Sequence, residues 1–449
     1  MGDFVKKFLS VLLATIMLMS TFSIISSASF NSLLETEADI VLLVNTDSET
    51  IIFDKNADKT TAPAHLAQIV TCMLVLENCP DLSVSITCKR ELLDGLYAQK
   101  APTVGILAGE TLTINELLYC MMVQSASDAA NMLADHVGNG LGNFVNMMNE
   151  YAKNLGCTNT KFINAHGCDD NGGGYTTAND MYLITKQALT NATFKELVNT
   201  TYKEIEPTNK YHQKRYLNTT NSMMVKGLSE YYYKSVSGVK AGRTDNAGCC
   251  AVSTASQDGY NYMLIVMNAP RKNIDEDEHL ENFAFLDSVK LYKWAFKNIV
   301  LKKVTNKTDV VTVVDVEYNS KVDHLRLVPA EEISALVPVG TEAGSLVIRP
   351  IEKETPKVVK APIKKGDVIG KAEVLYGNDV VATVDLVAAD DVDLNIILGF
   401  FGIIKTIFSS LIFKILFAIL AILLIVYIIL IIRKNRIMAK RKKIRKIKG

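Results

Sequence analysis

The sequence predicts a mixed α/β domain, followed by a small all-β domain and a C-terminal transmembrane helix. Three observations support this prediction. Segments of helical and strand-like periodicity alternate over residues 33–300. Residues 305–392 then alternate apolar and polar positions between glycine and proline turns, which indicates strands without helices. An uncharged apolar run occupies 415–432, near the end of the 449-residue chain.

Local patterns predict each element of the first domain in turn. Apolar runs flank the turn signal NTDSE within 36–54 and predict a β-hairpin. Pro63 and the helical spacing of Ile69, Met73 and Leu76 predict a helix over 63–77. The later predicted elements are a helical segment 113–136 with a break near QSAS, an amphipathic helix 144–156, a glycine-rich loop 164–177, a helix 178–189, three strands within 236–268 and a closing helix 282–299.

The N-terminus is typical of an export signal. Lys6 and Lys7 precede the apolar run FLSVLLATIMLMS, and SSA at 26–28 offers the small residues of a cleavage site. We therefore expect cleavage near Ala28, with 1–28 as a signal peptide that takes no part in the fold. The alternative is an uncleaved signal anchor.

The C-terminus predicts a membrane anchor. At about 1.5 Å per residue, the uncharged run 415–432 nearly spans a ~30 Å hydrocarbon core, and the amphipathic stretch 398–414 is expected at the outer interface. The tail 433–449 holds ten Lys or Arg and no acid. Such a tail marks the cytoplasmic side, so the bulk of the chain is expected outside the plasma membrane. Anionic lipid is the expected neighbour of the tail, and no nucleic acid is expected.

The composition is typical of a folded protein, because 49% of the residues are hydrophobic and 21% are charged. Export permits disulfides between the eight cysteines. However, Cys72 and Cys120 lie in apolar helical runs, and Cys249 and Cys250 lie in a predicted strand. Buried thiols that act as small apolar side chains are therefore favoured. No cysteine or histidine spacing indicates zinc, and no cofactor or metal is expected.

Five segments together resemble one family, the serine-type D-alanyl-D-alanine carboxypeptidases, which are low-molecular-weight penicillin-binding proteins (peptidase S11-like). The resemblance covers residues 36–390 and implies a transpeptidase-like domain of the β-lactamase/penicillin-binding-protein fold, followed by a β-rich domain. The segments are DKNADKTTAPAHLAQIVTCMLVLE, MMVQSASDAANMLADHVG, KFINAHGCDDNGGGYTTANDM, VSGVKAGRTDNAGCCAVSTA and APIKKGDVIGKAEVLYGNDVVATVDLVA.

The resemblance implies a serine nucleophile whose proton passes to a lysine one helical turn later. A hydroxyl needs such a base within hydrogen-bond reach, and a spacing of three residues on a helix supplies it. This chain has His65 at the serine position and Gln68 at the lysine position. The glutamine amide cannot take up and release a proton at neutral pH.

The other two motifs are partly kept. The second retains Ser125 but has Ser127 where the family carries Asn, and the third retains Lys240 and Gly242 but has Ala241 for Thr. Loss of the nucleophile of a serine hydrolase costs about 10⁶ in kcat, or ~8 kcal/mol of barrier. We therefore predict a pseudoenzyme that keeps the fold without the acyl-transfer chemistry.

The retained residues predict a ligand-binding cleft. Lys240 and Gly242 on an edge strand are suited to an extended peptide, and in the family the equivalent lysine is thought to face the substrate's terminal carboxylate. Ser125 adds a hydroxyl. Arg243 is a second candidate for a carboxylate, or else a solvated charge at the end of a strand. The expected partner is a peptidoglycan stem peptide or a cell-wall synthesis protein.

Other interpretations stay open. His65 could act as a nucleophile, or as a base for a hydroxyl of Ser125 or Ser127, which would give an active D-Ala-D-Ala carboxypeptidase with rearranged catalytic groups. His65 and His166 could bind a metal, although no third ligand is evident. The domains could also serve only as a spacer above the membrane.

Overall fold

The computed structural model describes residues 34–168, 172–227, 229–273, 280–377 and 379–445, so the predicted signal peptide 1–28 lies outside the described residues. The chain divides into two compact units. The first runs to Lys302 and includes Ser334–Val347 and Leu375–Ala382. The second consists of Lys303–Ile333, Ile348–Val374 and Thr383–Gly449.

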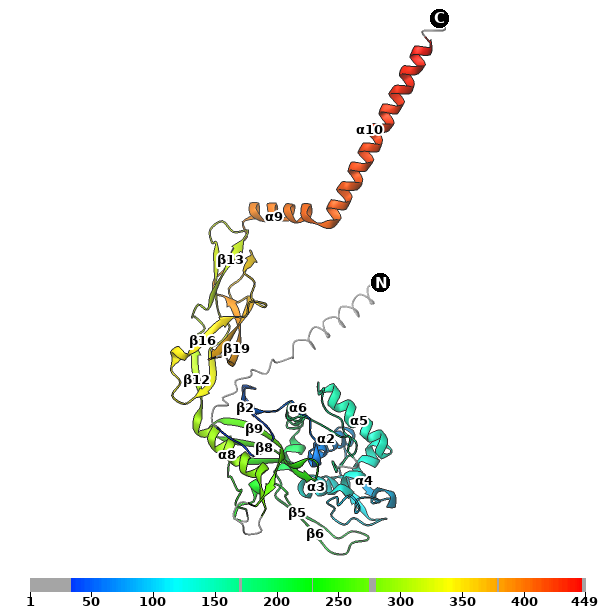
Figure 1. Ribbon diagram of the computed structural model, residues 1–449, viewed down its shortest axis with the longest axis vertical. Coiled ribbons are helices and arrows are strands. Elements are labelled where there is room, and N and C mark those ends of the chain that lie inside the picture. Colours follow the sequence, from blue (N-terminus) through cyan, green and yellow to red (C-terminus); the bar gives the residue numbers. More distant parts are fainter. Residues whose placement is uncertain (1–33, 169–171, 228, 274–279, 378, 446–449) are drawn as a thin grey trace. The chain divides into compact units, whose positions relative to one another are not determined.

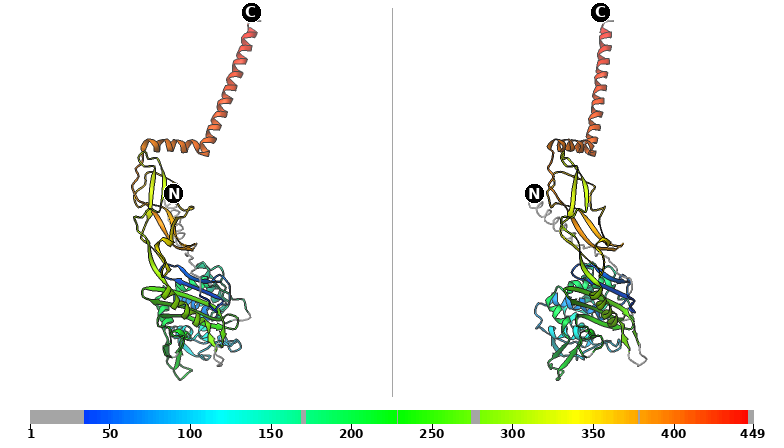
Figure 2. Two further views of the ribbon diagram at one scale, coloured as in Figure 1. Left: turned by 60° about the vertical axis from the view of Figure 1, so that its left-hand side comes forward. Right: turned by 90° about the vertical axis from the view of Figure 1, so that its left-hand side faces the viewer.

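A five-stranded antiparallel sheet lies at the centre of the first unit, with the strand order β2-β1-β9-β8-β7. Figures 1 and 2 show the blue strands β1 and β2 beside the green strands, although they come from opposite ends of this part of the sequence. The predicted hairpin and the three predicted strands are confirmed and join in one sheet. Its strands are β1 (Ile40–Asn45), β2 (Ile51–Lys55), β7 (Val236–Thr244), β8 (Gly248–Gln257) and β9 (Tyr260–Ala269).

The two faces of this sheet carry different layers, because successive side chains of a strand point to opposite sides. Met263 and Ile265 of β9 belong to the main apolar core, together with residues of the helical layer. Tyr262 packs against Phe296 of helix α8 (Phe283–Asn298), with 5.2 Å between the ring centroids. Helix α8 therefore covers one face and the helical layer covers the other (Figure 1).

The helical layer supplies most of the side chains of the main apolar core. The break predicted near QSAS falls between α3 and α4, at Ser125 and Ala126. Thr113 caps α3: its hydroxyl accepts from the backbone N–H of Glu116, whose carboxylate accepts from the backbone N–H of Thr113. The helices are η1 (a 3₁₀-helix, Ala64–Ala67), α2 (Gln68–Asn78), η2 (Arg90–Leu92), α3 (Ile114–Gln124), α4 (Ser127–Gly138), α5 (Leu141–Asn154), α6 (Ala178–Ala188), α7 (Ala192–Asn199) and η3 (Ser222–Met224).

A buried ion pair fixes the segment before β4 (Thr111–Thr113) against the hairpin of β5 (Tyr202–Ile205) and β6 (Arg215–Asn218). Arg215 donates to both carboxylate oxygens of Glu110, at 2.6 and 2.8 Å, and to the carbonyl oxygen of Val104 at 3.0 Å. Both charged side chains are almost fully buried. Two-point contacts of this kind fix geometry as well as charge.

The second predicted domain is built from strands, as expected. A six-stranded sheet has the order β16-β18-β19-β14-β13-β17, and β12 pairs with β15. Two helices follow, of which α10 contains Phe413–Met438, a segment long and apolar enough to cross a membrane by its length and composition. The elements are β12 (Ile299–Thr305), β13 (Thr312–Glu317), β14 (His324–Pro329), β15 (Ile333–Pro338), β16 (Leu346–Pro350), β17 (Val358–Lys360), β18 (Val368–Tyr376), β19 (Asp379–Ala388), α9 (Ile396–Ser409) and α10 (Leu411–Arg445).

All eight cysteines lie in the described part of the chain, and all are buried without forming a disulfide there. Burial raises the pKa of Cys88 to about 11 and that of Cys157 to about 12. The prediction of buried thiols is confirmed.

Candidate ligand-binding cleft

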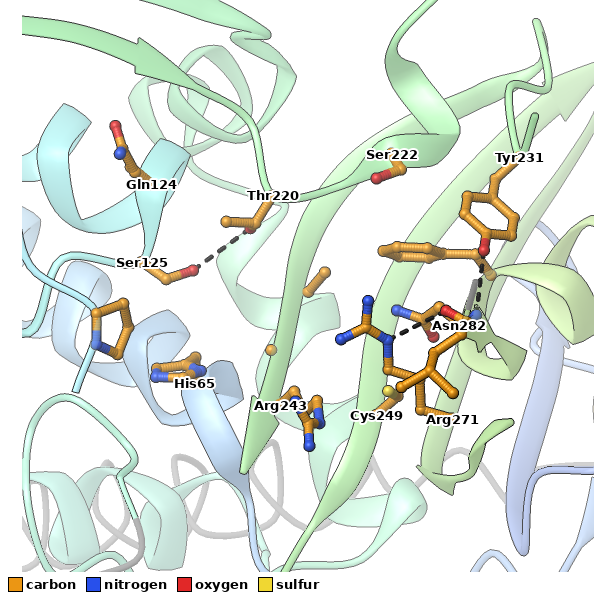
Figure 3. Close-up of a pocket in the computed structure, with 15 residues that line it drawn as sticks. His65, Gln124, Ser125, Thr220, Ser222, Tyr231, Arg243, Cys249, Arg271 and Asn282 are labelled. Carbon is orange, nitrogen blue, oxygen red and sulfur yellow. Dashed lines mark hydrogen bonds between the residues drawn. The ribbon is translucent and has the colours of Figure 1, made fainter. Parts of the chain in front are cut away.

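A cleft of about 470 Å³ opens beside β7 in the first unit (Figure 3). It brings together four of the residues singled out in the sequence, which are His65, Ser125, Gly242 and Arg243. Four others are buried and do not line it: Gln68, Ser127, His166 and Lys240. No carboxylate side chain is found among the described residues of its lining.

His65 lies in η1, one turn before α2, and its ring lines the cleft although only 5% of the residue is exposed. Burial, and then the charges of Lys240 and His166, lower its pKa to about 3. Burial lowers the pKa of His166 to about 4. Both imidazoles are therefore neutral at neutral pH.

Gln68 connects three parts of the site. Its Nε2 donates to the carbonyl oxygens of Ser125 and His166, both at 3.2 Å, from the first turn of α2. Its Oε1 is buried and has no hydrogen-bond partner in the described structure. The amide at the lysine position therefore joins α2, the end of α3 and the loop around His166, and it offers no base to the cleft.

Ser125 ends α3 in the left-handed conformation, with φ of 61°, and its hydroxyl faces the cleft. Lys240 Nζ donates to Ser125 Oγ and to the carbonyl oxygen of Ala241, the latter at 3.1 Å. Thr220 Oγ1 lies 3.4 Å from Ser125 Oγ (Figure 3). Ser125 therefore lies between the cleft and the amine of Lys240.

Burial lowers the pKa of Lys240 to about 7. The side chain comes from the interior of β7, where Lys240 is paired with Val252 of β8, and it is 1% exposed. No ion pair to Lys240 is found within the described ranges, so no carboxylate there offsets its loss of hydration. The charged and neutral amine are both populated at neutral pH.

Ser127 is fully buried at the start of α4, and its Oγ lies 3.7 Å from Cys168 Sγ. The same sulfur lies 3.7 Å from Nε2 of His65, and the backbone N–H of Cys168 donates to His166 Nδ1 at 3.1 Å. In the described structure, the His65 ring therefore lies beside a thiol, whereas a hydroxyl of Ser125 or Ser127 was one of the alternatives drawn from the sequence.

Two glycines allow η1 to sit this close to its neighbours. A Cβ at Gly242 would lie 2.7 Å from His65 Cβ, and a Cβ at Gly167 would lie 1.9 Å from the carbonyl oxygen of Ala64. Gly167 also has φ of +84°, which favours glycine. Ala64 itself has φ of 46°. The position of His65 therefore depends on backbone contacts on two sides.

Two arginine side chains line the other part of the cleft. Arg243 is about half exposed and lies 3.6 Å from Asp245, which is itself 89% exposed. Arg271 also lines the cleft and donates through Nε to the carbonyl oxygen of Leu280 at 3.2 Å. Figure 3 shows both guanidinium groups near Cys249 and away from Ser125. Guanidinium groups bind carboxylates in two-point contacts.

Sequence reasoning missed Thr220, Arg271 and Cys168. Each lies far along the chain from the motif residue that it accompanies, and none carries a spacing signal of its own. Among the described residues, no group of three or more His, Cys, Asp or Glu side chains is arranged to hold a metal.

Both parts of the chain match known families. The profile of the D-alanyl-D-alanine carboxypeptidase family matches residues 26–271, and that of the penicillin-binding protein 5 C-terminal domain matches residues 301–394. The chain is 27% identical over 396 residues to the D-alanyl-D-alanine carboxypeptidase DacF of Bacillus subtilis, covering 86% of this chain and 94% of that protein. It is 27% identical to DacC of Escherichia coli, covering 80% and 85%.

Solved structures show the same fold. Penicillin-binding protein 5 of Haemophilus influenzae superposes with a TM-score of 0.60 at 22% identity, covering 81% of this chain and 99% of that one. The DD-transpeptidase of Streptomyces K15 superposes with a TM-score of 0.52 at 26% identity, covering 59% and 99%. Since the first family profile spans more than half of the sequence, the chain belongs to the D-alanyl-D-alanine carboxypeptidase family of low-molecular-weight penicillin-binding proteins.

Proposed function

We propose that this chain is a membrane-anchored cell-wall protein that binds peptidoglycan stem peptides without the family's acyl transfer at position 65. One observation carries the proposal. Gln68 occupies the position of the family's base, and its Nε2 donates hydrogen bonds to two backbone carbonyl oxygens. An amide cannot relay a proton at neutral pH, and position 65 holds an imidazole instead of a hydroxyl. The chain is a pseudoenzyme for that reaction.

The cleft keeps what a peptide ligand needs. β7 is the last strand of its sheet, and an extended peptide can add to such an edge through backbone hydrogen bonds. Arg243 and Arg271 supply cations for a terminal carboxylate, and no described carboxylate lines the cleft to compete for them. Ser125 supplies a hydroxyl on the opposite side. The other candidate partner is a cell-wall synthesis protein that presents an extended segment with a carboxylate to the cleft.

The proposed place of the protein in the cell rests on the N-terminal apolar segment and on the C-terminal apolar helix with its basic tail. We propose that 1–28 is removed on export, that 398–414 lies in the outer interface and that 415–432 crosses the plasma membrane. The basic residues of 433–449 then remain in the cytoplasm. The continuous helix α10 and its apolar segment Phe413–Met438 support this arrangement.

The test uses the full chain in detergent and two measurements. Calorimetry with an N-acetylated L-Lys-D-Ala-D-Ala peptide is expected to show binding that weakens tenfold or more in Arg243→Gln and Arg271→Gln, because each loses a charge-assisted contact of about 1.5–3 kcal/mol. Arg326→Gln, outside the cleft on β14, is the matched control. A D-Ala release assay is expected to show no turnover.

Two results would count against the proposal. If calorimetry shows no peptide binding, stem peptides are not the ligand of the cleft. Release of D-Ala by the native chain would instead support the alternative, a working carboxypeptidase with rearranged catalytic groups.

A further inference from the structure

We propose that Ser125 is itself a nucleophile, with Lys240 as its base, and that the pair forms an acylation site in the cleft that does not use position 65. This inference goes beyond the binding function, since it predicts a covalent bond to reactive carbonyl compounds at a residue other than the one at position 65. It stands on the contact between Lys240 Nζ and Ser125 Oγ and on the position of Ser125 in the lining of the cleft, where 3% of the residue is exposed.

The backbone presents Ser125 to the cleft. Left-handed φ is uncommon for a residue with a side chain, and here it falls at the C-cap of α3, two residues before α4 begins. The carbonyl oxygen of Ser125 accepts from Gln68 Nε2 at 3.2 Å, which holds the turn in place. The hydroxyl is thus fixed between the buried lysine and the open volume.

Lys240 has the surroundings of a base. Its amine is enclosed on β7 and contacts Ser125 Oγ and the carbonyl oxygen of Ala241. The imidazole of His65 is neutral and competes for no proton at neutral pH. Because burial brings the pKa of Lys240 to about 7, much of the amine is neutral at pH 7 and able to accept a proton. Serine–lysine pairs of this type replace the serine–histidine pair in other hydrolases.

The step balances without any further reagent. Ser125 Oγ attacks the carbonyl carbon of a β-lactam, and its proton passes to neutral Lys240 Nζ. The carbon–nitrogen bond of the ring then breaks, and the ring nitrogen takes the proton from Nζ. The product is an ester on Ser125 and a neutral lysine. A β-lactam is the chosen probe because ring strain makes its amide more reactive than a peptide bond.

The cationic part of the cleft suits the same probe. A penicillin carries a carboxylate near its reactive carbonyl, and Arg243 and Arg271 lie across the cleft from Ser125 (Figure 3). One anionic ligand can therefore place its carboxylate at the arginines and its carbonyl group toward the serine.

The experiment is intact mass spectrometry of the full chain in detergent after incubation with benzylpenicillin, followed by peptide mapping. We expect one adduct on the native chain, mapped to Ser125, and none on Ser125→Ala. Ser222→Ala should keep the adduct, since Ser222 lines the same cleft and no lysine contacts its hydroxyl in the described structure. Lys240→Met should slow adduct formation by about 10²- to 10⁴-fold, the usual contribution of a general base.

Substitution of a buried lysine or of the turn serine could disturb folding, so Ser125→Cys is included. A thiol is a stronger nucleophile than a hydroxyl, and this variant should form the adduct at position 125. Absence of an adduct on both the native chain and Ser125→Cys would overturn the inference, as would an adduct mapped elsewhere. Peptide binding by calorimetry is measured separately, so loss of this inference leaves the proposed binding function in place.

Discussion

Gly242 and His65 approach so closely that a Cβ at position 242 would lie 2.7 Å from His65 Cβ and 2.9 Å from its backbone nitrogen. Real side chains do not tolerate contacts this short with backbone atoms. The strand β7 and the turn η1 are therefore packed backbone against backbone, and Gly242 sets the distance between the two walls of the cleft.

Gly242→Ala should consequently push η1 away from β7. We expect a loss of about 1–3 kcal/mol in the free energy of unfolding, as for other overpacked sites, together with weaker peptide binding. Thermal unfolding and calorimetry measure the two effects. Gly142→Ala is the matched control: it lies in α5 with nothing within 4 Å of the added Cβ, and alanine should stabilise that helix slightly. Equal effects at both positions would contradict the interpretation.

Two buried neutral histidines predict acid sensitivity. The pKa of His65 is lowered to about 3 and that of His166 to about 4, from 6.5 in the unfolded chain. Between pH 3 and pH 6.5 the unfolded chain binds more protons than the folded chain. The free energy of unfolding therefore rises with pH over this range and is lost as the pH falls from 6.5 toward 3. His65→Gln should flatten this loss, measured as the difference in Tm between pH 7 and pH 4.5. His212→Gln, at an exposed histidine, should leave the difference unchanged.

The Glu110–Arg215 pair predicts a large effect on stability. Arg215→Lys keeps the charge but loses the two-point contact and the bond to Val104. Disruption of a buried ion pair leaves groups without partners and typically costs about 3–5 kcal/mol. The expected drop in Tm should greatly exceed that of Lys59→Gln, which removes an exposed pair with Asp39 worth at most about 1 kcal/mol. Similar small drops for both variants would show that the buried pair contributes little.

Restoring the family's residues should restore its chemistry at position 65. In His65→Ser with Gln68→Lys, the new amine would reach the place where Gln68 Nε2 now contacts Ser125 and His166. Peptide mapping after benzylpenicillin treatment should then find an adduct at position 65. The single variant Gln68→Lys has no hydroxyl there and should show none at that position. A double variant that folds but stays unmodified at position 65 would mean that the cleft has lost more than these two groups.

The fold was predictable because its signals are local. Helical spacing around Ile69 and Met73, the break after Gln124 and the two turns between β7 and β9 each depend on a few neighbouring residues. The depth of a side chain depends instead on packing between distant segments. Lys240 was expected to meet a ligand directly, whereas the structure places it behind Ser125. Arg271 lines the cleft with no motif to mark it.

The eight buried thiols make the chain's fold independent of redox conditions. Burial holds the pKa of Cys88 at about 11 and that of Cys157 at about 12, and it raises the pKa of Cys72 as well, so few of these thiols ionise at neutral pH. Only a thiolate attacks an oxidant or an alkylating reagent readily. Disulfides take no part in this core, and its cysteines should react with iodoacetamide mainly as the chain unfolds.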